Sequence, residues 1–175
     1  YLAISNEHVN LVNKYIKKFI NKECREKIVI VIGGKERIDT IHNVIKEIAK
    51  NEITDDDIIL IHDAVRPFIT KEILKNSIEG AKKYGAAVAA IPAEDTMLIS
   101  NDGEYIDSIP NRRTLYKGQA PDSFRLKLLI ELESKLSEVD KEKITGTSQI
   151  CTLNNYPMKM TTGDPINFKI TTDAD

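Results

Sequence analysis

The stretch that decides the fold is Ile58-Ile-Leu-Ile-His62-Asp63-Ala64-Val65-Arg66-Pro67-Phe68. Its first four residues are apolar and three of them are β-branched, which predicts a buried strand. The strand gives way at once to polar residues. Ligands of parallel α/β sheets bind just beyond the carboxyl ends of the strands. An acid, an imidazole and a guanidinium at this position suggest a functional site, and a plain Asp–Arg corner is the alternative interpretation.

Apolar runs and amphipathic segments alternate on both sides of this stretch. We expect strands over 1–5, 28–32 and 86–91, and helices over about 9–19, 41–48 and 70–84. Such alternation is typical of a parallel sheet with right-handed crossover connections. The sequence therefore predicts the α/β class, with a mainly parallel sheet and helices on both faces.

The second half of the chain has a different pattern. Thr96–Ile99 and Tyr105–Ile106 flank Asn101-Asp102-Gly103, which is a hairpin signal, so we expect a β-arm that projects from the domain over about 94–118. A helix follows Phe124, a short helix covers about 145–153, and strands are expected over 158–161 and 166–170. Thr172-Asp173 resembles the cap of one more helix.

Length and composition place limits on the function. The 175 residues, 41% of them hydrophobic and 30% charged, fit a single domain spanning 1–175. The net charge of −2 argues against broad nucleic-acid binding, and no run is long enough to cross a membrane. Cys24 and Cys151 are far apart and have no metal-site spacing, so a reducing, cytoplasmic location is expected. Because Tyr1 already reads as part of a strand, we expect the sequence to be truncated at its N-terminus.

Gly33-Gly34 follows one predicted strand and precedes a helix. Glycine lets the backbone approach a ligand closely, and a helix N-terminus offers free amides. The third glycine of a dinucleotide fingerprint and the Gly-Lys-Ser/Thr ending of a P-loop are both missing. Two glycines alone favour a plain tight turn, but the polar residues that follow raise the odds of a ligand site: Lys35, Arg37, Asp39 and Thr40.

The remaining candidates are isolated charges. Lys169 lies in an apolar stretch, Asn167-Phe168-Lys169-Ile170, and Arg112 and Arg113 follow the arm. We find no Ser-His-Asp arrangement, no metal-binding histidine cluster and no paired catalytic carboxylates. A glycine-rich turn combined with Asp, Lys and Arg suits phosphoryl or nucleotidyl transfer, in which positioning and charge neutralisation dominate.

Five motifs in one order carry a resemblance to a known family: Gly33-Gly34-Lys-Glu-Arg37-Ile-Asp-Thr40, His62-Asp-Ala-Val-Arg-Pro67, Asp95-Thr96, Pro110-Asn-Arg112 with Gly118-Gln-Ala-Pro121 and Phe124, and Asn167-Phe-Lys169-Ile-Thr-Thr172. Together they resemble the cytidylyltransferases that activate polyol phosphates. The resemblance implies a Rossmann-like nucleotidyltransferase domain, CTP and a polyol phosphate as substrates, and a homodimer in which each arm reaches into the partner's active site.

The resemblance also implies roles for individual residues. Gly34 and Thr40 would hold the cytosine, Lys169 would bind the α-phosphate, and Mg²⁺ would bind through the CTP phosphates rather than to metal ligands of the protein. The implied catalytic residues are Lys169, Arg112 and Asp63. The implied nucleotide-binding residues are Gly33, Gly34, Lys35, Glu36, Arg37, Asp39, Thr40, Asp63 and Ala64. The implied substrate-binding residues are Arg66, Thr96, Arg112 and Lys169.

The sequence departs from the family pattern in three places. The glycine-rich loop that opens the family's domain is absent from these residues, so we expect the fragment alone to be inactive. Ala120 stands where the family has a threonine before proline, which removes one hydroxyl contact to substrate. Thr145-Gly-Thr-Ser148 carries no acidic residue where methylerythritol-type members often have Asp and Glu.

Two substrates fit the family, and the segment from Ile109 to Gln119 resembles the ribitol enzymes more closely. We therefore favour D-ribitol 5-phosphate, the precursor of teichoic acid or capsule units. The alternative is 2-C-methyl-D-erythritol 4-phosphate, the substrate in isoprenoid synthesis. A non-catalytic nucleotide-binding or dimerisation domain is the alternative from another functional class.

Overall fold

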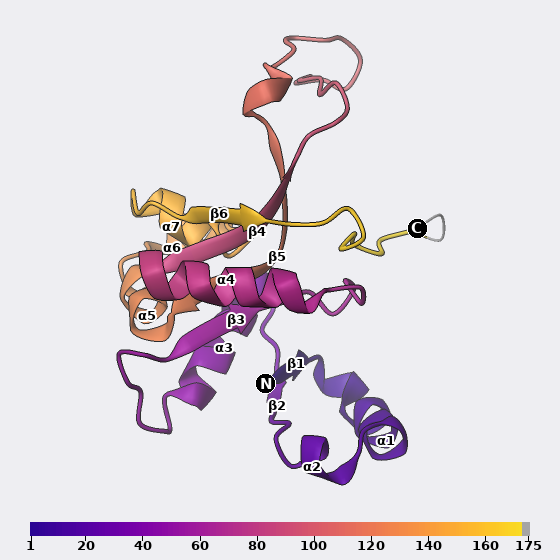
Figure 1. The fold of residues 1–175 in the computed structure, drawn as a ribbon, viewed down its shortest axis with the longest axis vertical. Coiled ribbons are helices and arrows are strands. Elements are labelled where there is room, and N and C mark those ends of the chain that lie inside the picture. The colour runs from indigo at the N-terminus through magenta and orange to yellow at the C-terminus, as the bar shows by residue number, and fades with distance from the viewer. Residues whose placement is uncertain (173–175) are drawn as a thin grey trace. The chain divides into compact units, whose positions relative to one another are not determined.

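A computed structural model describes residues 1–172 of the chain (Figure 1). The α/β class is confirmed, because strands and helices alternate through most of the sequence. The chain divides into two compact units. The first unit comprises Tyr1–Thr54 and Ile130–Asn154, and the second comprises Asp55–Leu129 and Asn155–Asp175. The prediction of one domain over 1–175 and that of a dimerisation role for the arm at about 94–118 stay predictions.

The first unit contains the predicted pair of strands. β1 (Leu2–Ile4) and β2 (Ile30–Ile32) pair in parallel. Between them lie a 3₁₀ turn at Asn6–His8, α1 (Val9–Phe19) and the short α2 (Lys22–Arg25). α1 forms where the apolar spacing predicted it, although none of its residues is fully buried.

The buried part of the first unit is supplied by four helices. These are α3 (Arg37–Ile48), the end of α5 (Leu126–Ser134), α6 (Glu138–Glu142) and α7 (Gln149–Leu153). His42 Nδ1 of α3 lies 2.7 Å from Glu133 of α5, and Asn154 Nδ2, just after α7, donates to the Leu132 carbonyl at 3.1 Å. The buried apolar side chains of this unit are Ile38, Ile41, Ile45, Leu132, Leu136, Ile144, Ile150 and Cys151.

The second unit is built on a four-stranded sheet in the order β3-β5-β4-β6. β3 is Ile58–Ile61, β4 is Ala86–Pro92, β5 is Tyr116–Arg125 and β6 is Lys159–Thr162. β4 and β6 are parallel, as expected. β5 inserts between β3 and β4 and runs antiparallel to both, so β3, β4 and β6 all share one direction, and the expected mainly parallel sheet is confirmed with β5 as its antiparallel member.

β5 was not predicted because its sequence, Tyr-Lys-Gly-Gln-Ala-Pro-Asp-Ser-Phe-Arg, lacks both a continuous apolar run and a clean alternation. Its residues from Gln119 to Phe124 are nevertheless buried, since the strand lies in the middle of the sheet and a helix packs along it. The buried polar groups find partners inside the unit. One example is the hydroxyl pair Ser77–Ser123, 2.8 Å apart, which joins the helix Lys71–Tyr84 to β5.

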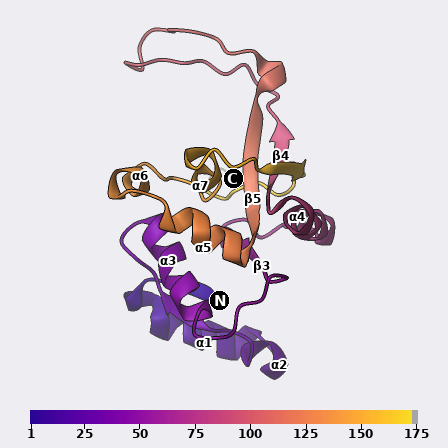
Figure 2. The same cartoon turned by 90° about the vertical axis from the view of Figure 1, so that its left-hand side faces the viewer.

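α4 (Lys71–Tyr84) packs along β4, β5 and β6 (Figure 2). It begins where the sequence predicted, because the Thr70 hydroxyl accepts a hydrogen bond from the Ile73 amide at 3.2 Å. It ends at Gly85, whose φ of +88° lies in the left-handed region that favours glycine. This turn leads the chain directly into β4.

The arm between β4 and β5 extends away from the sheet (Figure 1). It contains a 3₁₀ turn at Arg112–Thr114 and one isolated antiparallel bridge between Ile99 and Ser108. The predicted hairpin is therefore present only as this single bridge. The Asp102 carboxylate accepts bonds from the amides of Glu104 and Tyr105, which shapes the arm's tip without further strand pairing.

Two further predictions meet different outcomes. The prediction of a strand over 166–170 is wrong, because this segment forms a turn followed by an irregular stretch. The predicted cap at Thr172-Asp173 includes Asp173, which lies outside the described residues. None of the helices in the described part of the chain combines the length and apolarity that are needed to cross a bilayer.

Candidate active site

The loop after β3 folds into a compact turn. The amide of Arg66 donates to the Asp63 carbonyl at 3.0 Å. His62 Nε2 lies 2.9 Å from the Arg66 carbonyl oxygen, which can only accept a hydrogen bond, so Nε2 carries the ring proton. His62 therefore closes the loop. Ala64 lies at its exposed tip, and the Asp63 and Arg66 side chains lie at its base.

The structure brings three of the predicted residues together. Lys169 Nζ lies 3.7 Å from Asp63 Oδ2, and Arg66 Nε lies 3.4 Å from the same oxygen. The side chains of Asp63 and Arg66 are 12% and 11% exposed, whereas that of Lys169 is 44% exposed. Lys169 is therefore the cation of this cluster that a ligand can most readily reach.

Lys169 lies on an irregular segment, 163–170, that is tied down at several points. The backbone amides of Asn167 and Ile170 bond to the Asp164 and Val65 carbonyls, so residues 166–170 form no ladder with a neighbouring strand and the predicted strand is absent. The Gly163 amide donates to the Ala90 carbonyl at 2.9 Å, and the Ile170 amide donates to the Val65 carbonyl at 2.9 Å. The Gln119 side chain holds both backbone groups of Asp164.

Two aromatic rings add a contact between the two loops. The ring centroids of Phe68 and Phe168 are 5.4 Å apart, with a tilt of 36° between the planes. Such offset aromatic pairs are favourable beyond the apolar area that they bury. The loop after β3 and the segment that carries Lys169 are thus joined by hydrogen bonds, an ion pair and a ring contact.

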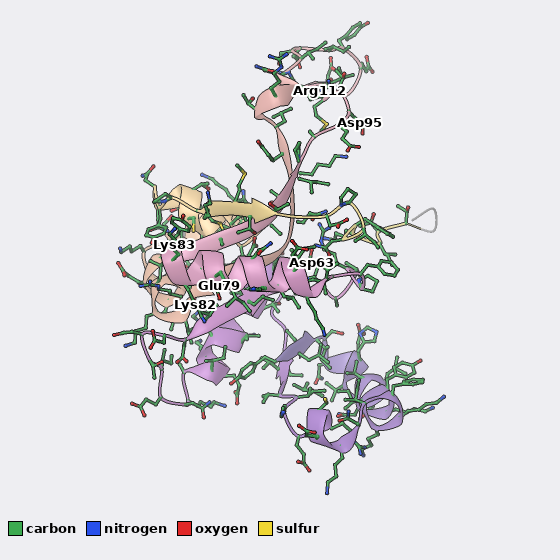
Figure 3. All side chains as sticks on the ribbon, in the orientation of Figure 1. Asp63, Glu79, Lys82, Lys83, Asp95 and Arg112 are labelled. Atoms are coloured by element: carbon green, nitrogen blue, oxygen red, sulfur yellow. The ribbon has the colours of Figure 1, made fainter. Side chains whose placement is uncertain are left out.

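Two other predicted residues are not brought to this cluster within the chain. Thr96 and Arg112 are exposed and belong to the arm. Arg112 Nη1 donates to the Glu94 carbonyl at 2.8 Å, which ties the two sides of the arm together. In Figure 3, Arg112 and Asp95 lie out on the arm, well apart from Asp63 at the sheet.

The glycine turn belongs to the first unit. Gly34 N donates to Thr40 Oγ1 at 2.9 Å, and this hydroxyl donates to the Glu36 carbonyl at 3.2 Å. The Glu36 amide donates to Asp39 Oδ2 at 3.1 Å at the start of α3. A Cβ on Gly34 would stand 2.1 Å from Asp39 Cβ, so only glycine fits there. Lys35 is exposed beside the turn.

The predicted nucleotide-binding residues at 33–40 therefore form one local structure, and Asp63, Arg66 and Lys169 form another. Asn167 was missed as a site residue. It is fully buried, and its backbone oxygen accepts from Arg66 Nη1 at 2.7 Å. The signal was its position two residues before Lys169, but a single Asn at the start of an apolar stretch gives no indication that its side chain is buried.

The second-unit cluster can bind a phosphate. Lys169 presents an exposed ammonium group, and its ion pair with Asp63, which Arg66 also contacts, keeps that group close to the end of β3. Charge stabilisation of a transferring phosphoryl group by positioned cations is the main requirement of nucleotidyl transfer.

Comparison with known proteins agrees with this chemistry. The model of the IspD family, 2-C-methyl-D-erythritol 4-phosphate cytidylyltransferase, matches residues 2–175. A crystal structure of 4-diphosphocytidyl-2C-methyl-D-erythritol synthase from Anaerococcus prevotii is 28% identical, with a TM-score of 0.79 over 99% of this chain and 75% of that one. The 2-C-methyl-D-erythritol 4-phosphate cytidylyltransferase from Thermus thermophilus is 25% identical, with a TM-score of 0.69 over 83% of this chain and 68% of that one.

A third solved structure shares the fold. The IspD protein from Francisella tularensis is 24% identical, with a TM-score of 0.78 over 85% of this chain and 69% of that one. The predicted resemblance to polyol-phosphate cytidylyltransferases is thereby confirmed, and so is the prediction that the chain is a nucleotidyltransferase. This chain belongs to the IspD family of CTP-dependent cytidylyltransferases.

Proposed function

We propose that the protein transfers the cytidylyl group of CTP to 2-C-methyl-D-erythritol 4-phosphate. A phosphate oxygen of the acceptor attacks the α-phosphorus of CTP, the bond between the α-phosphorus and the bridging oxygen to the β-phosphate breaks, and pyrophosphate leaves. No protein nucleophile is needed. The observation that carries the proposal is the cluster of Asp63, Arg66 and Lys169 at the end of β3, in a chain that belongs to the IspD family.

The choice of acceptor differs from the one that the sequence favoured. The family match and the 28% identical structure support the methylerythritol substrate. Nothing in these comparisons supports D-ribitol 5-phosphate, which rested on the segment from Ile109 to Gln119. The proposed acceptor is therefore 2-C-methyl-D-erythritol 4-phosphate, the substrate in isoprenoid synthesis.

In this proposal Lys169 binds the α-phosphate and holds the attacking phosphate in line. Asp63 and Ala64 lie beside the ribose, and Arg66 contributes to the binding of the acceptor phosphate. The Gly34–Thr40 turn encloses the cytosine, flanked by the other residues of the predicted nucleotide set: Gly33, Lys35, Glu36, Arg37 and Asp39. The tight packing of Gly34 on Asp39 supports a rigid pocket, since rigid sites discriminate best between bases.

We further propose that the protein is a homodimer whose arms act in trans, with Thr96 and Arg112 serving the partner's site. Two observations support this. Arg112 lies far from Asp63 in its own chain (Figure 3). The arm also carries large apolar side chains that are not covered by any other part of the described chain. They are Met97, Leu98, Ile99, Tyr105, Ile106 and Ile109, each between 46% and 74% exposed. Several large exposed apolar side chains on one segment favour an interaction site.

Mg²⁺ is proposed to arrive on the nucleotide, with phosphate oxygens as its main ligands. Among residues 1–172 no group of three or more His, Cys, Asp or Glu side chains is arranged to hold a metal ion. The Asp63 carboxylate is an oxygen donor of the type that Mg²⁺ prefers, so the cluster fits an ion held largely by the triphosphate. When bound, the ion would lower the charge that the attacking phosphate must approach.

The test is pyrophosphate release by the complete protein as its gene encodes it. CTP with 2-C-methyl-D-erythritol 4-phosphate should support turnover that ribitol 5-phosphate does not match, and ATP should not replace CTP. Faster turnover with ribitol 5-phosphate would overturn the acceptor assignment. Equal turnover with ATP would overturn the cytosine pocket at Gly34–Thr40.

A further inference from the structure

Asn167 is a fully buried polar residue in a segment that is otherwise largely exposed. Its side-chain Nδ2 donates to the Ala120 carbonyl of β5 at 2.7 Å. Its backbone amide donates to the Asp164 carbonyl at 2.9 Å, and its backbone oxygen accepts from Arg66 Nη1 at 2.7 Å. A single residue thus joins β5, the turn after β6 and the loop after β3.

The orientation of the Asn167 amide follows from its partner. A carbonyl oxygen can only accept, so the group facing Ala120 must be the NH₂. A carboxylate at this position would set an oxygen against an oxygen. The other atom, Oδ1, is buried and has no hydrogen-bond partner within the described residues. Leaving a buried polar group unpaired costs free energy. The bond from Nδ2 to the Ala120 carbonyl is the only hydrogen bond found for the Asn167 side chain within the described residues, so this bond holds the side chain in place.

This bond lies next to the residues of the proposed site. Lys169 follows Asn167 by two residues and pairs with Asp63. Arg66 reaches both Asp63 and the Asn167 carbonyl. A shift of the Asn167 backbone would therefore move Lys169 and would also remove one of the contacts that hold Arg66.

We propose that Asn167 is the positioning residue for the reaction, which holds Lys169 and Arg66 beside Asp63 by anchoring the segment 163–170 to β5 through Ala120. The inference rests on the proposed function and deepens it. Asn167 touches no substrate in this account and acts through Lys169 and Arg66. Misplacement of a catalytic group by about 1 Å costs on the order of a hundredfold in rate, so an anchor of this kind controls kcat.

A purely structural role for Asn167 is the competing explanation, and the sheet offers a matched control for it. The bond between Ser77 and Ser123 is also buried, also bridges two elements of the second unit and measures 2.8 Å, but neither residue adjoins Lys169. Ser77→Ala removes a buried hydrogen bond without touching the segment 163–170.

The first measurement needs no substrate. Amide hydrogen exchange at Ile170, whose N–H bonds to the Val65 carbonyl, reports whether the segment stays docked. In Asn167→Ser we expect exchange at Ile170 to accelerate by about tenfold or more relative to amides of α4. In Ser77→Ala the ratio between these amides should stay near that of the wild type. An unchanged Ile170 ratio in Asn167→Ser would overturn the proposal.

The second measurement is a double-mutant cycle with Lys169→Ala in the complete protein. Asn167→Ser should lower kcat by about tenfold or more with a much smaller change in the KM for CTP, and should add little to the loss already caused by Lys169→Ala. Ser77→Ala should instead combine additively. Full additivity of Asn167→Ser with Lys169→Ala would show independent roles and contradict the proposal.

A misfolded variant and a failure of the proposed function can both be distinguished from a failure of the proposed role of Asn167. If Asn167→Ser does not fold, Asn167→Ala removes the donor without burying a charge or a new polar group, and the same results are expected of it. If the wild-type protein shows no turnover of CTP with a polyol phosphate, the proposed function fails, while exchange at Ile170 still decides whether Asn167 anchors the segment that carries Lys169.

Discussion

The ammonium nitrogen of Lys169 lies 3.7 Å from Asp63 Oδ2, which joins the last described segment of the chain to the loop after β3. Arg66 approaches the same carboxylate at 3.4 Å from within that loop. Asp63 is thus placed between two cations, of which Lys169 is the more exposed. The predictions below follow from this arrangement and from the two other parts of the proposed site.

Replacing Lys169 with Ala should lower kcat by about a hundredfold or more, which is the scale seen when one preorganised donor to a transition state is lost. The reason is that Lys169 is the most exposed cation of the cluster. Steady-state release of pyrophosphate measures the effect. Lys159→Ala is the matched control, because Lys159 is an exposed lysine on β6 that lies over the Tyr84 ring. Near-normal kcat in a folded Lys169→Ala protein would remove Lys169 from the mechanism.

Mixing an Arg112→Ala chain with a Lys169→Ala chain should restore activity if the arm serves the partner. A mixed dimer would then have one site with both changes and one site with neither, so its activity should approach half that of the wild type. The measurement is turnover of heterodimers whose composition has been established by mass spectrometry. If Arg112 acts in its own chain, every site keeps one change and the mixture stays inactive.

Gly34→Ala should damage the cytosine turn. The added Cβ would stand 2.1 Å from Asp39 Cβ and 2.8 Å from the Asp39 carbonyl carbon, so the turn must shift. Overpacking of this kind costs about 1–3 kcal/mol in the free energy of unfolding, and the KM for CTP should rise with it. Chemical denaturation and CTP titration of the rate measure the two effects. Gly118→Ala is the control, because a Cβ there meets nothing within 4 Å. Equal behaviour of the two variants would contradict the proposed pocket.

The tip of the arm should depend on pH through Asp102. Hydrogen bonds from the Tyr105 amide, then the Glu104 amide and the Ser100 hydroxyl, hold the pKa of Asp102 below its usual 3.8. Because the folded pKa is lowered, the stabilisation is present above the ordinary value and is lost as the pH falls through the lowered pKa. An NMR titration should show the Glu104 and Tyr105 amides losing protection only below pH 3.8. Asp102→Asn should abolish this dependence, and persistence of the transition in that variant would assign it to another group.

Much of the fold could be predicted because it is encoded locally. The apolar period of α3, the Thr70 cap of α4 and the glycine at position 85 act over a few residues, so the sequence shows them directly. β5 could not be predicted in the same way. It is buried because it lies between two strands and α4 packs along it, and nothing within Tyr116–Arg125 reveals that those neighbours exist.

The candidate site could likewise be predicted only in part from the sequence. The residue types and their order, with Asp63 and Arg66 after one strand and Lys169 near the end, were readable from the sequence and carried the family resemblance. The anchoring role of Asn167 was not readable, because it depends on a bond to Ala120 in a strand that the sequence did not reveal.

The sequence by itself determined the local elements, the α/β class and the chemical inventory of the site, since periodicity, caps and residue types are properties of neighbouring positions. Only the tertiary structure decided that β5 runs antiparallel between β3 and β4, that residues 166–170 are held by separate backbone and side-chain bonds instead of a strand ladder, and that Lys169 meets Asp63. The physical reason is that these features come from contacts between residues far apart in the chain, whose hydrogen-bonding partners become available only when the whole sheet has formed.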